Sequence, residues 1–265
     1  MTPMQASKST VHGGADWDSA GRRGWDCVEV CVGFALILLT VWTPRPLQRW
    51  FYLTALLWIL LSTCISFPGW RAMGFRSAGF LRSLWVVGVA LVVAFVAVAT
   101  ASRLHTLHEP GGPVQWVMTF GGYAVWAFVQ QFLLQGYFLL RMQRLVPNPS
   151  GAAITAASIF AVAHLPNPVL TPISMLWGVT ACFVFLRFRN LYPLAVAHAI
   201  FGICVAITIP GPVMHNMRVG LGYLTYRAPH QIQPRQVQPR QVHLSQNDHT
   251  VSTDAWVMAE APTRR

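Results

Sequence analysis

The sequence predicts an all-α protein, a polytopic transmembrane helical bundle with about seven spans. Of its 265 residues, 54% are hydrophobic and only 10% are charged, whereas a soluble domain carries about a quarter charged residues. Long apolar runs recur along the chain, and a run of about 17–25 apolar residues can cross a bilayer as a helix. Only helices and closed barrels satisfy the backbone in lipid, and no alternating strand pattern supports a barrel here.

Seven apolar segments are expected to form the spans, in chain order. They are residues 27–43, 50–67, 84–102, 114–140, 151–165, 170–186 and 191–209. The fourth segment is long enough to tilt or to emerge from the bilayer. The fifth is short, and it ends at the proline-rich turn 166–168 because proline interrupts helices.

Two polar regions flank the membrane body. Residues 1–25 form a polar N-terminal arm, residues 26–209 the transmembrane bundle, and residues 210–265 a polar tail. The tail contains the repeat QPRQV and has too little apolar content to form a core, so we expect it to be disordered. No short apolar run with a small-residue cleavage site precedes the first span, so we expect no cleavable signal peptide.

The formal net charge of +11 is better explained by membrane topology than by nucleic-acid binding, because the basic residues are spread between the spans. We therefore expect a multi-pass protein of the cell membrane with a cytoplasmic N-terminus and no nucleic-acid partner. With that orientation, the outer loops hold Arg45, Arg49 and Arg103. The inner segments hold Lys8, Arg22, Arg23, Arg71, Arg76, Arg82, Arg141, Arg144, Arg187 and Arg189. The tail disagrees, since seven spans place Arg218 and Arg227 outside.

The loop between the third and fourth spans contains His105, His108 and Glu109. The order HxxHE matches neither helical zinc signature, HExxH or HxxEH, so an interfacial loop with exposed imidazoles is expected. Glu109 is the only carboxylate between Glu29 and Asp248. Acid–base chemistry that needs a carboxylate within the body would have to use it.

Five polar side chains stand inside apolar spans. They are Gln130, Gln131, Gln135, His164 and His198. Amides and imidazoles are costly in hydrocarbon unless they face one another or a wet cavity. One interpretation is structural: amides that bridge helices, a histidine that caps a helix end and a satisfied core histidine. Because separate helices supply the set, we favour a functional cavity in which Gln130, Gln131, His164 and His198 lie within roughly 10 Å of each other.

The pattern resembles the CPBP family of intramembrane proteases, which includes the CAAX prenyl endopeptidases and the Abi proteins, over roughly residues 114–209. That family carries E-E-x-x-x-R on one helix, F-x-x-x-H on the next, and H-x-x-x-N or H-x-x-x-D on a later one. The corresponding segments here are Gln130-Gln131-x-x-x-Gln135, Phe160-x-x-x-His164 and His198-x-x-x-Gly202.

The resemblance implies catalytic positions at Gln130, Gln131, Gln135, His164 and His198. In the family, the first glutamate is taken to activate a water molecule with help from the histidines, and some accounts place a divalent metal such as zinc at the site. The two histidines of this chain are the candidate ligands. A glutamine amide cannot act as a general base near neutral pH. Without carboxylates, an arginine at position 135 would be an unpaired charge in lipid, so the three replacements are consistent as a unit.

Two functions follow from this pattern. The first is an intramembrane endopeptidase that acts on membrane-embedded or lipid-modified peptides, with a histidine as base or with a metal held by the histidines. The alternative is a noncatalytic membrane binding or scaffold protein on the same fold, which recognises such a peptide in its cavity.

Overall fold

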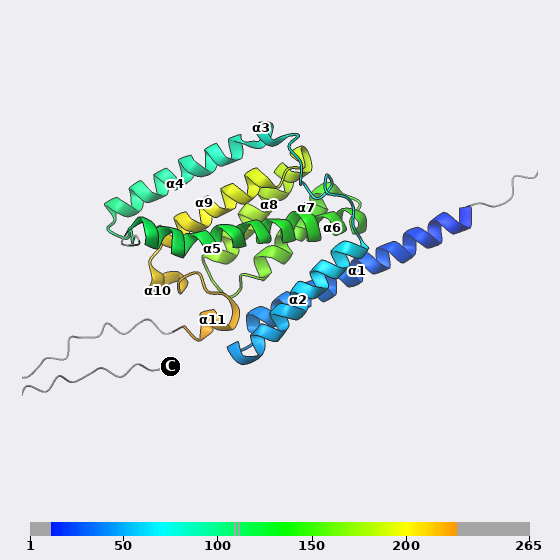
Figure 1. Cartoon of the computed structure of the whole chain (residues 1–265), viewed down its shortest axis with the longest axis horizontal. Coiled ribbons are helices and arrows are strands. Elements are labelled where there is room, and N and C mark those ends of the chain that lie inside the picture. The colour runs from blue at the N-terminus through cyan, green and yellow to red at the C-terminus, as the bar shows by residue number, and fades with distance from the viewer. Residues whose placement is uncertain (1–11, 109, 111, 227–265) are drawn as a thin grey trace, which may run out of the picture. The chain divides into compact units, whose positions relative to one another are not determined.

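The computed structural model of the chain describes residues 12–108, 110 and 112–226. This part of the chain is helical and has no strand (Figure 1), which confirms the predicted all-α class. The elements are α1 (His12–Trp42), α2 (Arg45–Ile65), α3 (Phe80–Ser83), α4 (Trp85–Arg103), α5 (Pro113–Gln131), the π-helix η1 (Phe132–Leu139), α6 (Leu140–Leu145), α7 (Pro149–Val162), α8 (Leu170–Phe188), α9 (Tyr192–Thr208), α10 (Gly211–Met214) and α11 (Gly220–Leu224).

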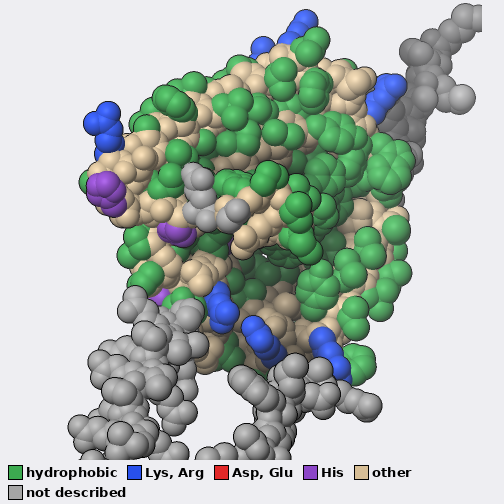
Figure 2. Space-filling model, turned by 60° about the vertical axis from the view of Figure 1, so that its left-hand side comes forward, with side chains coloured by type: hydrophobic (Ala, Val, Ile, Leu, Met, Phe, Trp, Pro, Cys, Tyr) green, Lys and Arg blue, Asp and Glu red, His purple; other side chains and the backbone are tan. Residues whose placement is uncertain are grey.

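Each of the seven predicted spans corresponds to a helix or a run of helices. Five are long and apolar enough to cross a membrane: Gly21–Trp42, Arg45–Ile65, Phe80–Arg103, Pro113–Leu145 and Leu170–Phe188. Helices α7 and α9 are apolar but shorter, with 14 and 17 residues. Hydrophobic side chains cover much of the face in Figure 2, with arginine side chains near its edges. The chain is therefore a multi-pass membrane protein.

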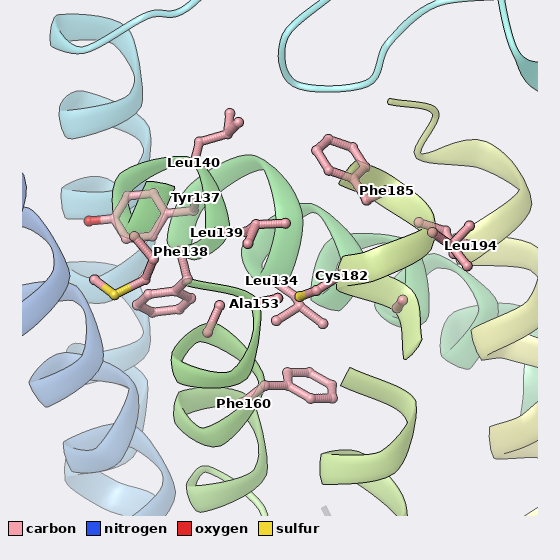
Figure 3. Close-up of a cluster of buried hydrophobic side chains, with 14 of the residues drawn as sticks. Leu134, Tyr137, Phe138, Leu139, Leu140, Ala153, Phe160, Cys182, Phe185 and Leu194 are labelled. Carbon is pink, nitrogen blue, oxygen red and sulfur yellow. The ribbon is translucent and has the colours of Figure 1, made fainter. Parts of the chain in front are cut away.

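The bundle packs around the π-helix. Helix α7 lies against α8, α9 lies against both α4 and α5, and α1 lies against α2. The central cluster includes Leu134 and Phe138 of η1, Phe160 of α7 and Phe185 of α8 (Figure 3). Helices α7 and α8 approach closely because small side chains face each other, as is common in membranes. A Cβ added to Gly178 would lie 3.1 Å from the Ala157 Cβ.

The fourth span is one long helix of 33 residues, Pro113–Leu145, which continues past the predicted end at residue 140. Its middle section, Phe132–Leu139, is a π-helix rather than an α-helix. Such segments are rare and often occur at functional sites. This one begins directly after Gln131 and contains Gln135, so the altered backbone coincides with the first motif.

Two ion pairs with buried carboxylates attach α1 to α6. Arg144 donates from Nε and Nη2 to the two carboxylate oxygens of Asp26, at 2.7 and 2.6 Å. Arg141 donates from Nε to Oε2 of Glu29 at 2.6 Å. Both carboxylates are fully buried. Arg141 and Arg144, expected from the sequence as topology signals, therefore also hold the first span to the fourth.

Further hydrogen bonds satisfy the Glu29–Arg141 pair. Ser66 Oγ donates to Glu29 Oε1 at 2.5 Å, and Tyr137 Oη donates to the Glu29 carbonyl at 2.7 Å. The Arg141 guanidinium lies 3.8 Å from the centroid of the Tyr137 ring. A buried ion pair is stable only when its remaining donors and acceptors are satisfied in this way.

The described structure continues past both predicted boundaries of the membrane body. Helix α1 begins at His12, within the predicted arm. After residue 209, α10 and α11 pack onto the bundle: Asn167 Nδ2 donates to the carbonyls of Met214 and Arg218, and the Gly220 amide donates to the Leu165 carbonyl at 2.7 Å. The rest of the predicted tail, with the QPRQV repeat, lies outside the described residues.

Removing one member of the Glu29–Arg141 pair should destabilise the protein strongly. We expect Glu29→Gln or Arg141→Gln alone to lower the free energy of unfolding by about 3–5 kcal/mol, because each leaves an uncompensated buried group. The double variant Glu29→Gln/Arg141→Gln should lose less than the sum of the two single losses. Thermal unfolding in detergent measures this, with the exposed Arg45→Gln as control. Additive losses would show that the two side chains are not coupled.

Candidate functional site

Gln131 and His198 are hydrogen-bonded to each other in the interior of the bundle. Gln131 ends α5 and is fully buried, and His198 lies in the second turn of α9 and is also buried. Gln131 Nε2 lies 2.8 Å from His198 Nδ1. An amide nitrogen is a donor, so in this arrangement Nδ1 carries the imidazole lone pair and the ring hydrogen is on Nε2.

His164 has the opposite tautomer. It lies two residues after the end of α7 at Val162, and its Nδ1 lies 2.7 Å from the carbonyl oxygen of Phe160, one turn earlier. A carbonyl oxygen only accepts, so His164 Nδ1 carries the hydrogen and Nε2 keeps its lone pair. The F-x-x-x-H spacing thus has a direct structural role, because it places the histidine over the carbonyl of the phenylalanine.

The Phe160 ring brings the two histidines together. Its centroid lies 4.8 Å from that of the His164 ring and 5.9 Å from that of the His198 ring, both in edge-on arrangements. The Trp177 ring of α8 lies 6.0 Å from His198. Helices α5, α7, α8 and α9 therefore meet around one aromatic cluster. The structure places Gln131, His164 and His198 in this cluster.

The other two glutamines are placed differently. Gln135 is fully buried in η1, and neither its amide nitrogen nor its oxygen has a hydrogen-bond partner among the described residues. Gln131 Oε1 and Trp177 Nε1 are also buried without partners there. Gln130 is half-buried, and no hydrogen bond joins it to the other motif side chains in the described part of the chain. Gln131 and Trp177 in the aromatic cluster, and Gln135 in η1, therefore carry neutral donors and acceptors without a partner among the described residues.

Tyr123 occupies the space next to Gly202, the position where the resemblance places an asparagine or aspartate. A Cβ added to Gly202 would overlap the Tyr123 hydroxyl and the adjacent ring atoms. Gly202 follows His198 by one helical turn, so the phenol lies along the same side of α9 as the imidazole. Sequence reasoning missed Tyr123. The available signal was its spacing, seven residues before Gln130 and hence on the same side of α5.

The side chains present do not fit a zinc site. Zinc takes thiolate, imidazole or carboxylate ligands, usually three or four of them. In the described part of the chain, no three His, Cys, Asp or Glu side chains gather closely enough to hold a metal. His198 uses its Nδ1 lone pair on Gln131, and amide oxygens are poor substitutes for carboxylates. In the interfacial loop, His108 Nδ1 bonds the Thr106 carbonyl at 2.7 Å, and Glu109 lies outside the described residues.

A family model described as "Type II CAAX prenyl endopeptidase Rce1-like" matches residues 112–204. The matched segment runs from the start of α5 into α9 and contains all three motifs, so the resemblance found from the motifs is confirmed there. No curated protein and no solved structure matches the chain. Together with the apolar helices, the family match identifies an integral membrane protein with a CAAX-protease-like segment.

The contact between Tyr123 and Gly202 makes a steric prediction. Gly202→Ala should lower the free energy of unfolding by about 1–3 kcal/mol, because the added methyl group overlaps the phenol. Adding Tyr123→Ala should relieve that overlap, so Gly202→Ala should cost less in the Tyr123→Ala background than in the wild type. Gly88→Ala on α4 is the matched control, because no atom lies within 4 Å of its added Cβ. The test compares the unfolding of the wild type, the two single variants and the double variant in detergent. An equal loss of stability from Gly202→Ala in both backgrounds would contradict the predicted contact.

Proposed function

We propose that this protein is a diverged, noncatalytic relative of the CAAX-type membrane endopeptidases that binds a membrane-embedded or lipid-modified peptide at the Gln131–His198 site. The observation that carries the proposal is the hydrogen bond from the Gln131 amide to His198 Nδ1. In the family pattern a glutamate stands at this position and can accept a proton. The amide instead consumes a lone pair of the neighbouring imidazole.

The carboxylates with described side chains are engaged elsewhere. Asp26 is paired with Arg144, and Glu29 with Arg141 and Ser66. Both belong to the contact between α1 and α6. Neither is available to activate a water molecule beside His198, so general-base catalysis by a carboxylate has no support among these residues.

The unused hydrogen-bonding groups support a binding role. Gln131 Oε1 and Gln135 Oε1 can accept, and Gln135 Nε2 and Trp177 Nε1 can donate. All four are neutral, and their combination matches the donor and acceptor of a peptide group. A peptide bound here would satisfy groups that otherwise cost free energy in a dry interior. The proposed binding function thus uses amide and indole groups that have no role in a hydrolytic mechanism.

One observation favours the alternative, an active endopeptidase. His164 keeps a lone pair on Nε2, because its Nδ1 hydrogen is held by the Phe160 carbonyl. A histidine in this state is a general-base candidate for activating water. In that mechanism His164 would take the proton of the attacking water, and the Nε2–H of His198 could donate to the carbonyl oxygen of the peptide. No metal enters this mechanism.

The proposal also covers the membrane in which the protein lies and its orientation there. The protein resides in the cell membrane with its N-terminus in the cytoplasm, supported by the excess of arginine and lysine in the expected inner segments. Its partners are the bilayer and a peptide that reaches the bundle from within it.

Peptide binding without cleavage separates the two functions. We expect reporter peptides with an apolar or prenylated end to raise the melting temperature of the purified protein, because a ligand that binds only the folded state stabilises it. The same peptides should stay intact in membranes that contain the wild-type protein. His164→Ala should leave the cleavage rate at background, as measured by mass spectrometry of the peptides.

Cleavage by the wild type that disappears in His164→Ala and in His198→Ala would establish the peptidase and end the noncatalytic proposal. Ser158→Ala on α7 is a suitable control, because its hydroxyl bonds a carbonyl of its own helix and lies outside the aromatic cluster.

Restoring the family residues tests whether the three glutamines changed together. Gln130→Glu/Gln131→Glu should destabilise the protein, because adjacent carboxylates in a low-dielectric site repel and at least one must bind a proton. Adding Gln135→Arg should recover stability, since a guanidinium can pair with a carboxylate through two hydrogen bonds. We expect the triple variant to melt higher than the double variant, and cleavage assays of both show whether hydrolysis returns. A triple variant that melts below the double variant would refute the electrostatic coupling.

A further inference from the structure

Two connections at one end of the bundle form a single surface. The segment 66–79 links α2 to α3, and residues 189–191 link α8 to α9. The Leu191 amide donates to the Gly74 carbonyl at 3.1 Å. Asn190, fully buried, donates from Nδ2 to the Arg76 carbonyl at 2.6 Å. These bonds fix the two connections relative to each other, although they are more than a hundred residues apart in sequence.

Arg76 and Arg189 are neighbours on this surface. Arg76 donates from Nε to the Ala78 carbonyl at 3.1 Å and from Nη2 to the carbonyl of Phe188, the residue before Arg189, at 3.5 Å. Arg189 has a left-handed backbone, with φ at 49°. Partial burial lowers the pKa of Arg189, and the positive charge of Arg76 lowers it further. The Arg76 guanidinium therefore lies against the backbone that leads into Arg189, and the Arg189 guanidinium lies 5.6 Å from the centroid of the Phe185 ring.

No carboxylate compensates these two charges in the described part of the chain. The acids with described side chains, Asp26 and Glu29, form ion pairs with arginines of α1 and α6. Further basic side chains at the same end add to the charge. They are the exposed Arg71, Arg82 and Arg187. A fixed, partly buried pair of like charges without a counterion indicates that an anion comes from outside the chain.

The surface lies where three apolar helices begin or end. The apolar helix α2 ends at Ile65, α8 ends at Phe188, and α4 begins at Trp85. Trp70 and Trp85 are exposed by 64% and 53%, and exposed tryptophan is typical of the boundary between hydrocarbon and water. A ligand at this depth can place its acyl chains along the helices and its charged group on the arginines.

We propose that Arg76 and Arg189 bind the phosphate of an anionic phospholipid headgroup. The planar guanidinium offers two parallel N–H groups to a phosphate, so two arginines can hold its oxygens at once. Phosphatidylcholine carries its own quaternary ammonium beside the phosphate and gains less from the pair. The site therefore distinguishes anionic from zwitterionic lipid, and it is separate from the Gln131–His198 cluster.

Native mass spectrometry of the delipidated full-length protein tests the site, with dioleoylphosphatidylglycerol, dioleoylphosphatidylcholine and sodium phosphate as probes. The wild type should bind phosphatidylglycerol about tenfold more tightly than phosphatidylcholine, a difference of about 1.4 kcal/mol, because no ammonium group in the lipid competes with the two arginines. Arg76→Gln/Arg189→Gln should remove this preference. Arg189→Gln, which breaks no side-chain hydrogen bond among the described residues, should weaken phosphatidylglycerol binding while the protein keeps its melting temperature.

The matched control is Arg45→Gln/Arg49→Gln, which removes two exposed arginines at the opposite end of α2 and should leave the lipid preference unchanged. An equal loss in this control would show a general effect of net charge and overturn the proposal. Unchanged phosphatidylglycerol affinity in Arg189→Gln and in the double variant would overturn it too. Sodium phosphate bound as tightly as phosphatidylglycerol would overturn the lipid assignment.

Discussion

The cost of an uncompensated polar group in lipid governs where this chain places its charges and amides. Asp26 and Glu29 would be costly within the first span, and each is fully buried beside an arginine of the fourth. The surrounding serine and tyrosine hydroxyls complete the hydrogen bonding. These groups, together with apolar packing such as Phe34 on Phe138, attach the α1–α2 hairpin to the rest of the bundle.

The same cost explains why the candidate site is neutral. A Glu-Glu-Arg set and a Gln-Gln-Gln set can each be accommodated in a dry interior, whereas mixtures leave a charge unpaired. The change extends further than the first motif, because Gly202 and Tyr123 fit together sterically. The site has two histidines with aromatic side chains around them, but Asp26 and Glu29, the carboxylates with described side chains, are paired elsewhere. Binding does not need a group that accepts a proton, which is why we favour it over hydrolysis.

The fold class and the order of the helices could be predicted from hydropathy, because a span must be about 20 apolar residues long wherever it packs. From the motifs we expected Gln131 and His198 in one cavity with Gln130 and His164, but not the direct hydrogen bond between Gln131 and His198. The π-helix was not predicted, since nothing in the sequence FLLQGYFL distinguishes it from an α-helix, and the packing of Phe132 against Gly136 accompanies it. The two ion pairs between α1 and α6 could not be predicted from the sequence for a different reason. Asp26 and Glu29 share with Arg141 and Arg144 a spacing of three residues, but a correspondence across more than a hundred residues shows in no local pattern.

The separation of Glu29 from Arg141 has a consequence for how the protein is made. The two residues are 112 positions apart, and at about 5–20 residues per second a ribosome needs on the order of ten seconds to add the arginine after the glutamate. During that interval Glu29 has no arginine partner yet, and Asp26 has only Arg22, 3.8 Å away in its own helix. They must wait at the water interface, or against a cation supplied by the insertion machinery, until the fourth span arrives. The first helix therefore reaches its final depth only after more than half of the chain has been synthesised, so membrane entry and folding cannot be separate stages for this protein.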